Sequence, residues 1–292
     1  MAKFNGVYVA LVTPFTDDYE VDYEELRNLC NWLIEEGVDG LVPAGSLGEY
    51  ATLTVEERKN VVETVIKASN KRVPVIVGSG APSTAQAVEW VQHAKEQGAA
   101  GVMALPPINY KPLENEIIEH YKALSEVGLP VIAYNNPKDY PTDLTPDLLV
   151  EISKFTNIIG VKEFSGDIRR MQEILEKTDL EVMVGVDDLA VEGALIGATG
   201  WISGVPNALP KEGVELFQLA KEGKVKEALD LYKYLLPLFR FDDSPQLVQS
   251  IKHMMKLIGR PVGPTRPPRL PLSEAQYQKV EEAFNHSRRV TI

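Results

Sequence analysis

The feature that most constrains the fold of this sequence is a regular alternation of short apolar runs with longer amphipathic segments. Eight such runs, rich in Val, Ile, Ala and Gly, follow one another along the chain. They are Val7–Phe15, Gly40–Gly45, Pro74–Gly80, Gly101–Pro107, Pro130–Asn136, Ile158–Phe164, Glu181–Asp187 and Gly200–Val205. Near-continuous apolar runs of this kind are typical of strands that are buried on both faces of a parallel sheet.

The segments between the runs carry the signals of helices. Apolar residues recur with helical spacing in Thr54–Ser69 and Ser83–Gln97, and both segments begin with residues close to a capping box. Helical segments end at Gly37, Gly98 and Gly128, each just before the next run. Eight strand–helix units predict an α/β fold, a (β/α)8 TIM barrel. The first run is not followed by a Gly-x-Gly-x-x-Gly turn, which disfavours a doubly wound sheet.

The chain continues past the eighth run with helical segments only. We expect Leu209–Lys221 to be the last barrel helix. A C-terminal three-helix extension is expected at Val225–Phe239, Ser244–Ile258 and Ser273–Phe284, with a proline-rich connector at Gly259–Pro271 that cannot form regular helix. We therefore predict a barrel over residues 1–222 and a helical extension over residues 223–292 that packs on it.

The charge balance limits the partners of this protein. The 292 residues carry a net charge of −12, and an acidic surface repels phosphate backbones, which argues against nucleic acid. No apolar run approaches the roughly 20 residues that span a membrane, and we interpret the N-terminal segment as a first strand, not a signal peptide. The single cysteine, Cys30, lies on the apolar face of a helical segment and is expected to be a packed thiol. These features indicate a cytoplasmic protein without a membrane partner.

Lys162 is the residue that most directly indicates a chemistry. It lies within the run Ile158–Phe164, which we expect to be buried. Burial lowers the pKa of a lysine, and the neutral amine is the nucleophile that attacks a carbonyl or an imine. The alternative is a structural lysine that pairs with a carboxylate inside the barrel, although its neighbour Glu163 points to the opposite face of the strand.

Two further segments lie at the carboxyl ends of strands, where a barrel of this kind places its chemistry. Tyr134 ends the fifth run beside Lys162, and its phenol can carry a proton, although a tyrosine that only fills the barrel is the alternative. Gly45–Tyr50 follows the second run, and its glycines allow backbone N–H groups to converge on a carboxylate. Ser46 adds a hydroxyl there, although an ordinary turn can have the same composition.

The histidines argue against a metal site. They lie in helical segments, away from the strand ends, at His93, His120, His253 and His286. Asp187 and Asp188 form an acidic pair at a strand end, and two adjacent carboxylates without a histidine make a poor transition-metal site. We interpret this pair as a partner for a hydroxyl or an ammonium, or as a helix N-cap.

Three motifs together resemble one enzyme superfamily. They are Gly45–Glu49, Tyr134–Pro137 and Val161–Asp167, and they resemble the dihydrodipicolinate synthase/N-acetylneuraminate lyase superfamily over essentially the whole chain. The resemblance implies a (β/α)8 barrel with a C-terminal helical extension, a Schiff-base lysine, a tyrosine that relays protons and a turn that binds a carboxylate. It also implies a homotetramer or homodimer, and the implied mechanism needs no metal and no organic cofactor.

The resemblance assigns roles to particular positions. By position, Lys162 would form the Schiff base, Tyr134 and Ser46 would relay protons, and the backbone N–H groups of Ser46 and Leu47 would hold the carboxylate. The residues expected to bind substrate are Leu47, Gly48, Tyr110, Asp187, Trp201 and Ser203. The implied substrate is a small 2-oxo acid, or a cyclic imine that carries a carboxylate.

Some residues differ from those of the best-known members of this superfamily, and these differences decide which substrate we expect. Leu47 stands where a dihydrodipicolinate synthase has threonine, and Asp139 stands where it has arginine. The aromatic that follows the fourth strand is shifted to Tyr110, and the bulky Trp201 suggests a short substrate. The segments Leu105–Lys111, Gly185–Ala190, Leu247–Lys252 and Arg266–Leu272 add a resemblance to Δ1-pyrroline-4-hydroxy-2-carboxylate deaminases.

We therefore expect a deaminase that converts Δ1-pyrroline-4-hydroxy-2-carboxylate and water to 2,5-dioxopentanoate and ammonia, with little condensation of pyruvate with aspartate semialdehyde. The alternative is a class I Schiff-base lyase or synthase of the dihydrodipicolinate synthase type that acts on pyruvate and an aldehyde. A non-catalytic sugar- or acid-binding barrel is disfavoured because Lys162, Tyr134 and Ser46 are all present.

Overall fold

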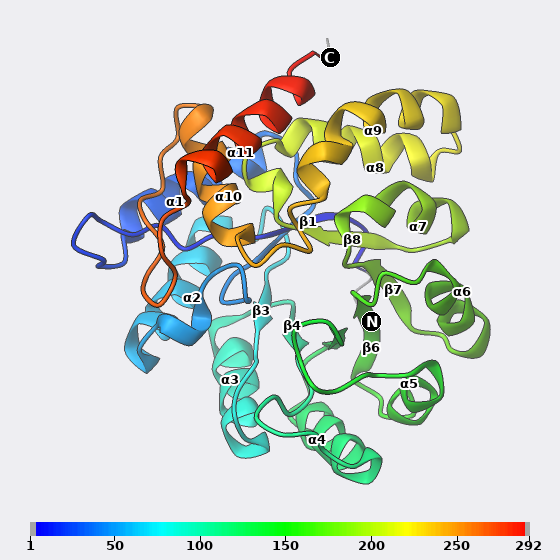
Figure 1. Ribbon diagram of the computed structural model, residues 1–292. Coiled ribbons are helices and arrows are strands. Elements are labelled where there is room, and N and C mark those ends of the chain that lie inside the picture. The colour runs from blue at the N-terminus through cyan, green and yellow to red at the C-terminus, as the bar shows by residue number, and fades with distance from the viewer. Residues whose placement is uncertain (1–3, 290–292) are drawn as a thin grey trace.

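The computed structural model describes residues 4–289, and within them eight parallel strands form a barrel (Figure 1). The strands are β1 (Gly6–Ala10), β2 (Gly40–Val42), β3 (Ile76–Gly78), β4 (Gly101–Ala104), β5 (Val131–Asn135), β6 (Ile158–Glu163), β7 (Glu181–Val184) and β8 (Gly200–Ser203). Their order in the sheet is β2-β1-β8-β7-β6-β5-β4-β3, and a parallel bridge between Leu41 and Val75 joins β2 to the β3 side. Seven strands lie within the predicted apolar runs and β1 begins one residue before its run, at Gly6, so the predicted (β/α)8 barrel is confirmed.

Helices surround the strands as an outer ring (Figure 1). They are α1 (Tyr23–Glu35), α2 (Val55–Ser69), α3 (Thr84–Gln97), α4 (Glu114–Glu126), α5 (Pro146–Ile152), α6 (Ile168–Lys177), α7 (Ala190–Ile196) and α8 (Pro210–Lys221). Short 3-10 turns follow three of the strands at η1 (Tyr50–Thr52), η2 (Asp187–Leu189) and η3 (Val205–Asn207). The expected caps are present, because Thr54 forms a full capping box with Glu57 and the Ser83 side chain accepts the N–H of Gln86.

The C-terminal extension consists of α9 (Val225–Phe239), α10 (Leu247–Leu257) and α11 (Glu274–Ser287). α9 packs on α7 and α8, and α11 packs on α9 and α10 (Figure 1). α10 begins at Leu247, later than predicted from Ser244, because Ser244 and Leu247 close turns with the preceding backbone instead. In the described part of the chain, none of the helices is long and apolar enough to cross a membrane.

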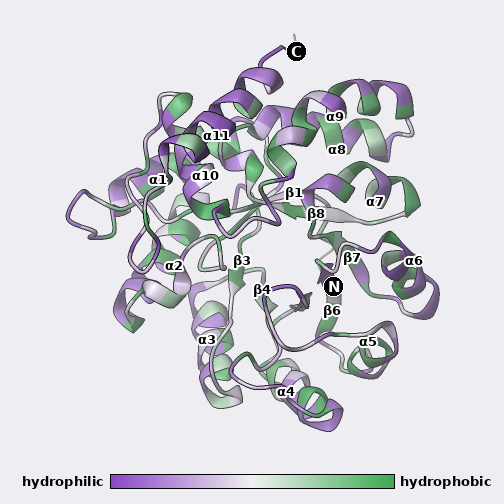
Figure 2. Cartoon of the chain, viewed as in Figure 1, coloured by the Kyte–Doolittle hydropathy of each residue, from purple (hydrophilic) through white to green (hydrophobic). Residues whose placement is uncertain are grey.

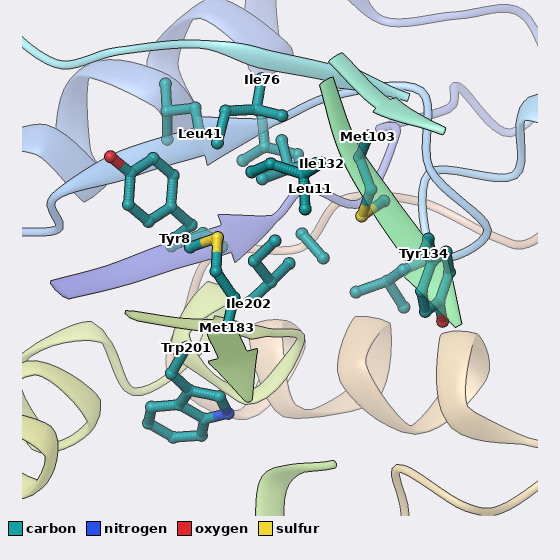
Figure 3. Close-up of a cluster of buried hydrophobic side chains, with 14 of the residues drawn as sticks. Tyr8, Leu11, Leu41, Ile76, Met103, Ile132, Tyr134, Met183, Trp201 and Ile202 are labelled. Carbon is teal, nitrogen blue, oxygen red and sulfur yellow. The ribbon is translucent and has the colours of Figure 1, made fainter. Parts of the chain in front are cut away.

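Side chains fill the inside of the barrel. Tyr8, Ile76, Ile132 and Met183 are all nearly or completely buried, and they belong to the cluster in Figure 3. Tyr8 lies so close to β2 that a Cβ on Gly40 would be 2.1 Å from its ring, so only glycine fits there. Figure 2 shows the contrast between the hydrophobic strands and the helices, which carry hydrophobic and hydrophilic residues side by side. Because side chains fill the barrel interior, a substrate can bind only at an end of the barrel. In this fold, active sites lie at the carboxyl ends of the strands.

Candidate active site

Lys162 and Tyr134 lie side by side at the carboxyl ends of β6 and β5. They are direct partners in the register of these strands, so both side chains point into the barrel. The Lys162 Nζ atom lies 4.5 Å from the centre of the Tyr134 ring and 5.5 Å from that of Phe164. Lys162 and Tyr134 expose only 6% and 5% of their surface, respectively. The predicted pairing of an amine with a phenol is therefore present in an apolar setting.

Glu163 faces away from Lys162, as the strand alternation predicts. Its Oε2 atom accepts a hydrogen bond from the Asn135 side chain at 2.9 Å, and its Oε1 atom accepts the backbone N–H of Ser165 at 2.6 Å. These contacts lie outside the strand ring, so Glu163 holds the outer face of β6 and is not the ion-pair partner of Lys162.

Burial dominates the electrostatics of Lys162 and lowers the pKa of its ammonium. Three carboxyl groups raise this pKa instead. In decreasing order of effect they are Asp242, Asp187 and Asp139. No ion pair holds the Nζ atom within the described residues 4–289. The structure therefore favours the neutral amine, with acidic groups near enough to stabilise a cation that forms on its nitrogen.

Asp187 and Asp242 form a buried acid pair beside this lysine. The backbone N–H of Asp187 donates to Asp242 Oδ2 at 3.0 Å, and Trp201 Nε1 donates to Asp187 Oδ1 at 3.0 Å. Burial raises the pKa of both carboxyl groups, and the charge of Asp242 raises that of Asp187 further. The Ser203 hydroxyl lies against Asp187 and, with Trp201, opposes the rise in the pKa of that carboxyl group. Sequence reasoning missed Asp242, because it comes from the segment after α9.

The turn after β2 has the geometry of a carboxylate site. Ala44 and Glu49 both have φ of 57°, so the chain bends sharply at each end of Ser46–Gly48. The Thr13 hydroxyl holds the turn by donating to the Gly48 carbonyl at 2.7 Å. In the described part of the chain, the N–H groups of Ser46 and Leu47 donate to no backbone carbonyl. These N–H groups can therefore donate to a bound anion, and the carboxylate site at this turn stays a prediction.

Ser46 also contacts a tyrosine that sequence reasoning missed. Its Oγ atom lies 2.9 Å from the hydroxyl oxygen of Tyr140, which follows β5. Tyr140 in turn hydrogen-bonds the hydroxyl of Tyr50, in η1. The proximity of Tyr140 to the Tyr134–Pro137 motif could have indicated that it lies near the site. The direction of its side chain could not be predicted, because it lies in a polar loop.

The remaining predicted residues are not all brought together. Leu47 packs against the backbone just after β8, so closely that a Cβ on Gly204 would be 2.8 Å from its Cδ2 atom. Tyr110 is 55% exposed, and no hydrogen bond joins it to Ser46 among the described residues. Trp201 points away from the barrel interior (Figure 3) and packs on Phe217 and Phe239. The expectation that Trp201 occupies substrate space is wrong, and it acts on the site only through Asp187.

A buried ion cluster ties the turn to the C-terminal extension. Lys252 Nζ lies 3.0 Å from Glu49 Oε1, and the two side chains expose 4% and 0% of their surface. The backbone N–H of Arg266 donates to Glu49 Oε2 at 3.0 Å, and Arg269 Nη1 lies 3.6 Å from the same oxygen. Lys252 also donates to the Pro264 carbonyl at 2.6 Å. The residue next to Gly48 is therefore clamped by chain that lies beyond residue 250.

The histidines lie on helices α3, α4, α10 and α11, as predicted. His120 is buried between the Thr84 hydroxyl at 2.9 Å and the Leu105 carbonyl at 3.2 Å, and burial lowers its pKa to about 4. Among residues 4–289, no three His, Cys, Asp or Glu side chains gather as potential metal ligands.

Comparisons with known proteins show which protein family this chain resembles in sequence and in structure. A model described as the dihydrodipicolinate synthetase family matches residues 3–287. The chain is 38% identical over 286 residues to a 4-hydroxy-tetrahydrodipicolinate synthase of Jannaschia sp., with 97% of this chain and 98% of that protein covered. It is 36% identical over 285 residues to a synthase of the same name from Coxiella burnetii, with 96% and 97% covered. The crystal structure of dihydrodipicolinate synthase from Aquifex aeolicus superposes with a TM-score of 0.93 at 32% identity and covers 98% of both chains.

These comparisons correct the expected reaction. The deaminase interpretation is wrong, because relatives between 32% and 38% identical over nearly the whole chain carry the synthase name. The structure gives a physical reason for the error. Lys252, Arg266 and Arg269 belong to two of the segments that favoured the deaminase, yet they hold Glu49 in the ion cluster. Those segments serve the fold around the turn, so they do not identify a substrate.

Proposed function

Because this chain belongs to the dihydrodipicolinate synthetase family, we propose that it is a class I Schiff-base lyase or synthase that joins pyruvate to an aldehyde or cleaves such a product. The single observation that supports this most strongly is Lys162, a buried amine with a lowered pKa beside the Tyr134 phenol. An amine in this state attacks a ketone, and a positioned phenol moves the protons that follow.

In the proposed reaction, the pyruvate carboxylate binds the N–H groups of Ser46 and Leu47. The neutral Lys162 Nζ atom attacks the C2 carbonyl, and water leaves to give a protonated Schiff base. The cation lowers the pKa of Asp242, and the carboxylate that forms there lowers the energy of the cation in turn. The cation draws electrons from the C3–H bond, the C3 proton passes by way of the Tyr134 hydroxyl to water, and an enamine forms.

The enamine C3 then attacks the aldehyde carbonyl, and a carbon–carbon bond forms. Tyr134 supplies a proton to the new alkoxide, since its pKa is raised well above its usual range and the phenol remains protonated. Water finally adds to C2 and releases Lys162. The reverse sequence cleaves the product, so one site accounts for both a lyase and a synthase.

Reductive trapping tests the Schiff base. Borohydride added with pyruvate should fix a pyruvate adduct on Lys162, which mass spectrometry of peptides would locate. Lys162→Ala should form no adduct, whereas Lys138→Ala should still form it, because Lys138 pairs with Asp243 near the site but is partly exposed. An adduct on another lysine, or equal trapping in Lys162→Ala, would refute the proposal.

The aldehyde requires a separate assay. The names of the relatives make aspartate semialdehyde the first aldehyde to test with pyruvate. A panel of aldehydes with and without a second carboxylate should be compared at equal concentration, with disappearance of pyruvate as the readout. Consumption of pyruvate with none of them would leave the synthase direction unsupported even if trapping succeeds.

A further inference from the structure

A cavity of about 430 Å3 lies in the C-terminal extension, away from the carboxyl ends of β5 and β6. It is bounded by α10, α11, the connector at residues 259–271 and the loop at residues 17–19. Figure 1 shows this connector in orange, between α10 and α11. The volume is in the range of small-molecule sites, about 300–1,000 Å3. Neither Lys162 nor Tyr134 lines the cavity, so it is separate from the candidate active site.

Lysine and arginine side chains give the wall of this cavity a positive charge. Lys252 and Arg269 belong to the ion cluster around Glu49, and Lys256 lies in the last turn of α10. Against them the described wall carries one acidic side chain, the exposed Asp17. The whole chain has a net charge of −12, so this wall is locally opposite in sign to the protein. Such a wall attracts a small anion.

Two of these cations have hydrogen-bond donors to offer to a ligand. Arg269 Nη1 lies 3.6 Å from Glu49 Oε2, whereas Lys252 Nζ lies 3.0 Å from Oε1, and 31% of the Arg269 side chain is exposed. Within residues 4–289, no carboxylate forms an ion pair with Lys256. A guanidinium fork with an ammonium in the same cavity suits a phosphate, which carries nearly two charges, better than a carboxylate, which carries one.

The rest of the wall is largely apolar and includes one acceptor without a partner. Pro264, Pro267 and Tyr277 line the cavity, and their flat surfaces can pack against a planar ring. Gln249 also lines it, and its Nε2 atom donates to the Leu270 carbonyl at 3.2 Å. The Oε1 atom of Gln249 is buried and accepts no hydrogen bond from the described residues. A ligand N–H that reached this oxygen would satisfy it.

We propose that this cavity binds a small organic phosphate whose planar ring carries an N–H donor. Arg269 and Lys256 hold the phosphate, the proline and tyrosine surfaces pack on the ring, and Gln249 Oε1 accepts the ring N–H. A nucleoside monophosphate has this combination of groups. The site lies apart from Lys162, so neither the Schiff base nor the choice of aldehyde bears on it.

Isothermal titration calorimetry of the full chain with adenosine monophosphate tests the site. Ribose 5-phosphate lacks the ring and adenosine lacks the phosphate, so each should bind at least tenfold more weakly. Lys256→Met and Arg269→Met should each weaken the binding of adenosine monophosphate about tenfold, the usual effect of one lost charged hydrogen bond. Asp17→Asn should strengthen it at least twofold, because the opposing charge is gone.

Two further variants separate this site from general attraction by charge. Lys279→Met is the matched control for Lys256→Met, because Lys279 is exposed on α11 and does not line the cavity, and its affinity should stay within twofold of the unaltered protein. Gln249→Leu should weaken the binding of adenosine monophosphate and leave that of ribose 5-phosphate unchanged, because only the first has a ring N–H.

Several results would overturn the inference. They are no binding of adenosine monophosphate, equal binding of ribose 5-phosphate, or equal losses in Lys256→Met and Lys279→Met. Loss of binding in Lys162→Ala would also overturn it, because the ligand would then occupy the candidate active site. If circular dichroism shows that Arg269→Met does not fold, Lys256→Met and Asp17→Asn still decide, since both change exposed side chains.

Discussion

Replacing Lys252 by methionine tests whether the buried ion cluster stabilises the turn at which we propose that the substrate carboxylate binds. Two unit charges 3.0 Å apart attract by about 5.5 kcal/mol at an effective dielectric constant of about 20. Desolvation offsets part of this, since burial lowers the pKa of Lys252 to about 8. Glu49 would keep the Arg266 N–H and the more distant Arg269. We expect the free energy of unfolding to fall by about 3 kcal/mol, the low end for an orphaned buried charge.

Urea unfolding followed by circular dichroism measures this loss. Lys67→Met is the control, because Lys67 lies at the same 3.0 Å from Glu63 but is 75% exposed, and its loss should be about 0.5 kcal/mol or less. The double variant Lys252→Met/Glu49→Gln should recover most of the stability, because no unpaired charge remains buried and glutamine still accepts the Arg266 N–H. A loss below 1 kcal/mol in Lys252→Met, or a double variant no more stable than the single one, would refute the reasoning.

Three further outcomes follow from the site. Asp242→Asn removes the largest of the charges that raise the pKa of Lys162, so that pKa should fall. Borohydride trapping should then extend to lower pH, and a shift of its pH profile to higher pH would contradict the assignment. Gly78→Ala would place a Cβ 2.3 Å from the Ala44 carbonyl oxygen, so we expect a loss of about 2–3 kcal/mol in urea unfolding and weaker pyruvate binding by calorimetry. Because the proposed chemistry uses only an amine and hydroxyl groups, prolonged dialysis against EDTA should leave pyruvate trapping unchanged, and recovery of a lost activity by zinc or magnesium would be inconsistent with it.

Local patterns were sufficient to predict the barrel. Each strand was visible because burial on both faces leaves a short run of apolar residues, and each cap at Thr54 and Ser83 depends on residues within one turn. The pairing of Tyr134 with Lys162 was also predictable, because both follow from strand order and alternation.

Contacts between distant segments were not predictable in the same way. Asp242 approaches Lys162 only because α9 folds back over η2, and no spacing in the sequence records that path. Trp201 fits an apolar interior or an apolar outer layer equally well, and only the packing of Phe217 and Phe239 decides between them. Tyr140 lies in a loop, where no strand alternation determines the direction of a side chain.

The clamp on Glu49 has a consequence for the order in which the protein is made. During synthesis the turn at residues 45–49 leaves the ribosome early, but the groups that hold Glu49 arrive only with residues 252–269. Until then a carboxylate destined for complete burial has no partner other than water, so the nascent barrel cannot close around it at low cost. The turn at residues 45–49 therefore reaches its final structure only at the end of translation, and a chain that stops before residue 252 should accumulate as a form sensitive to proteases.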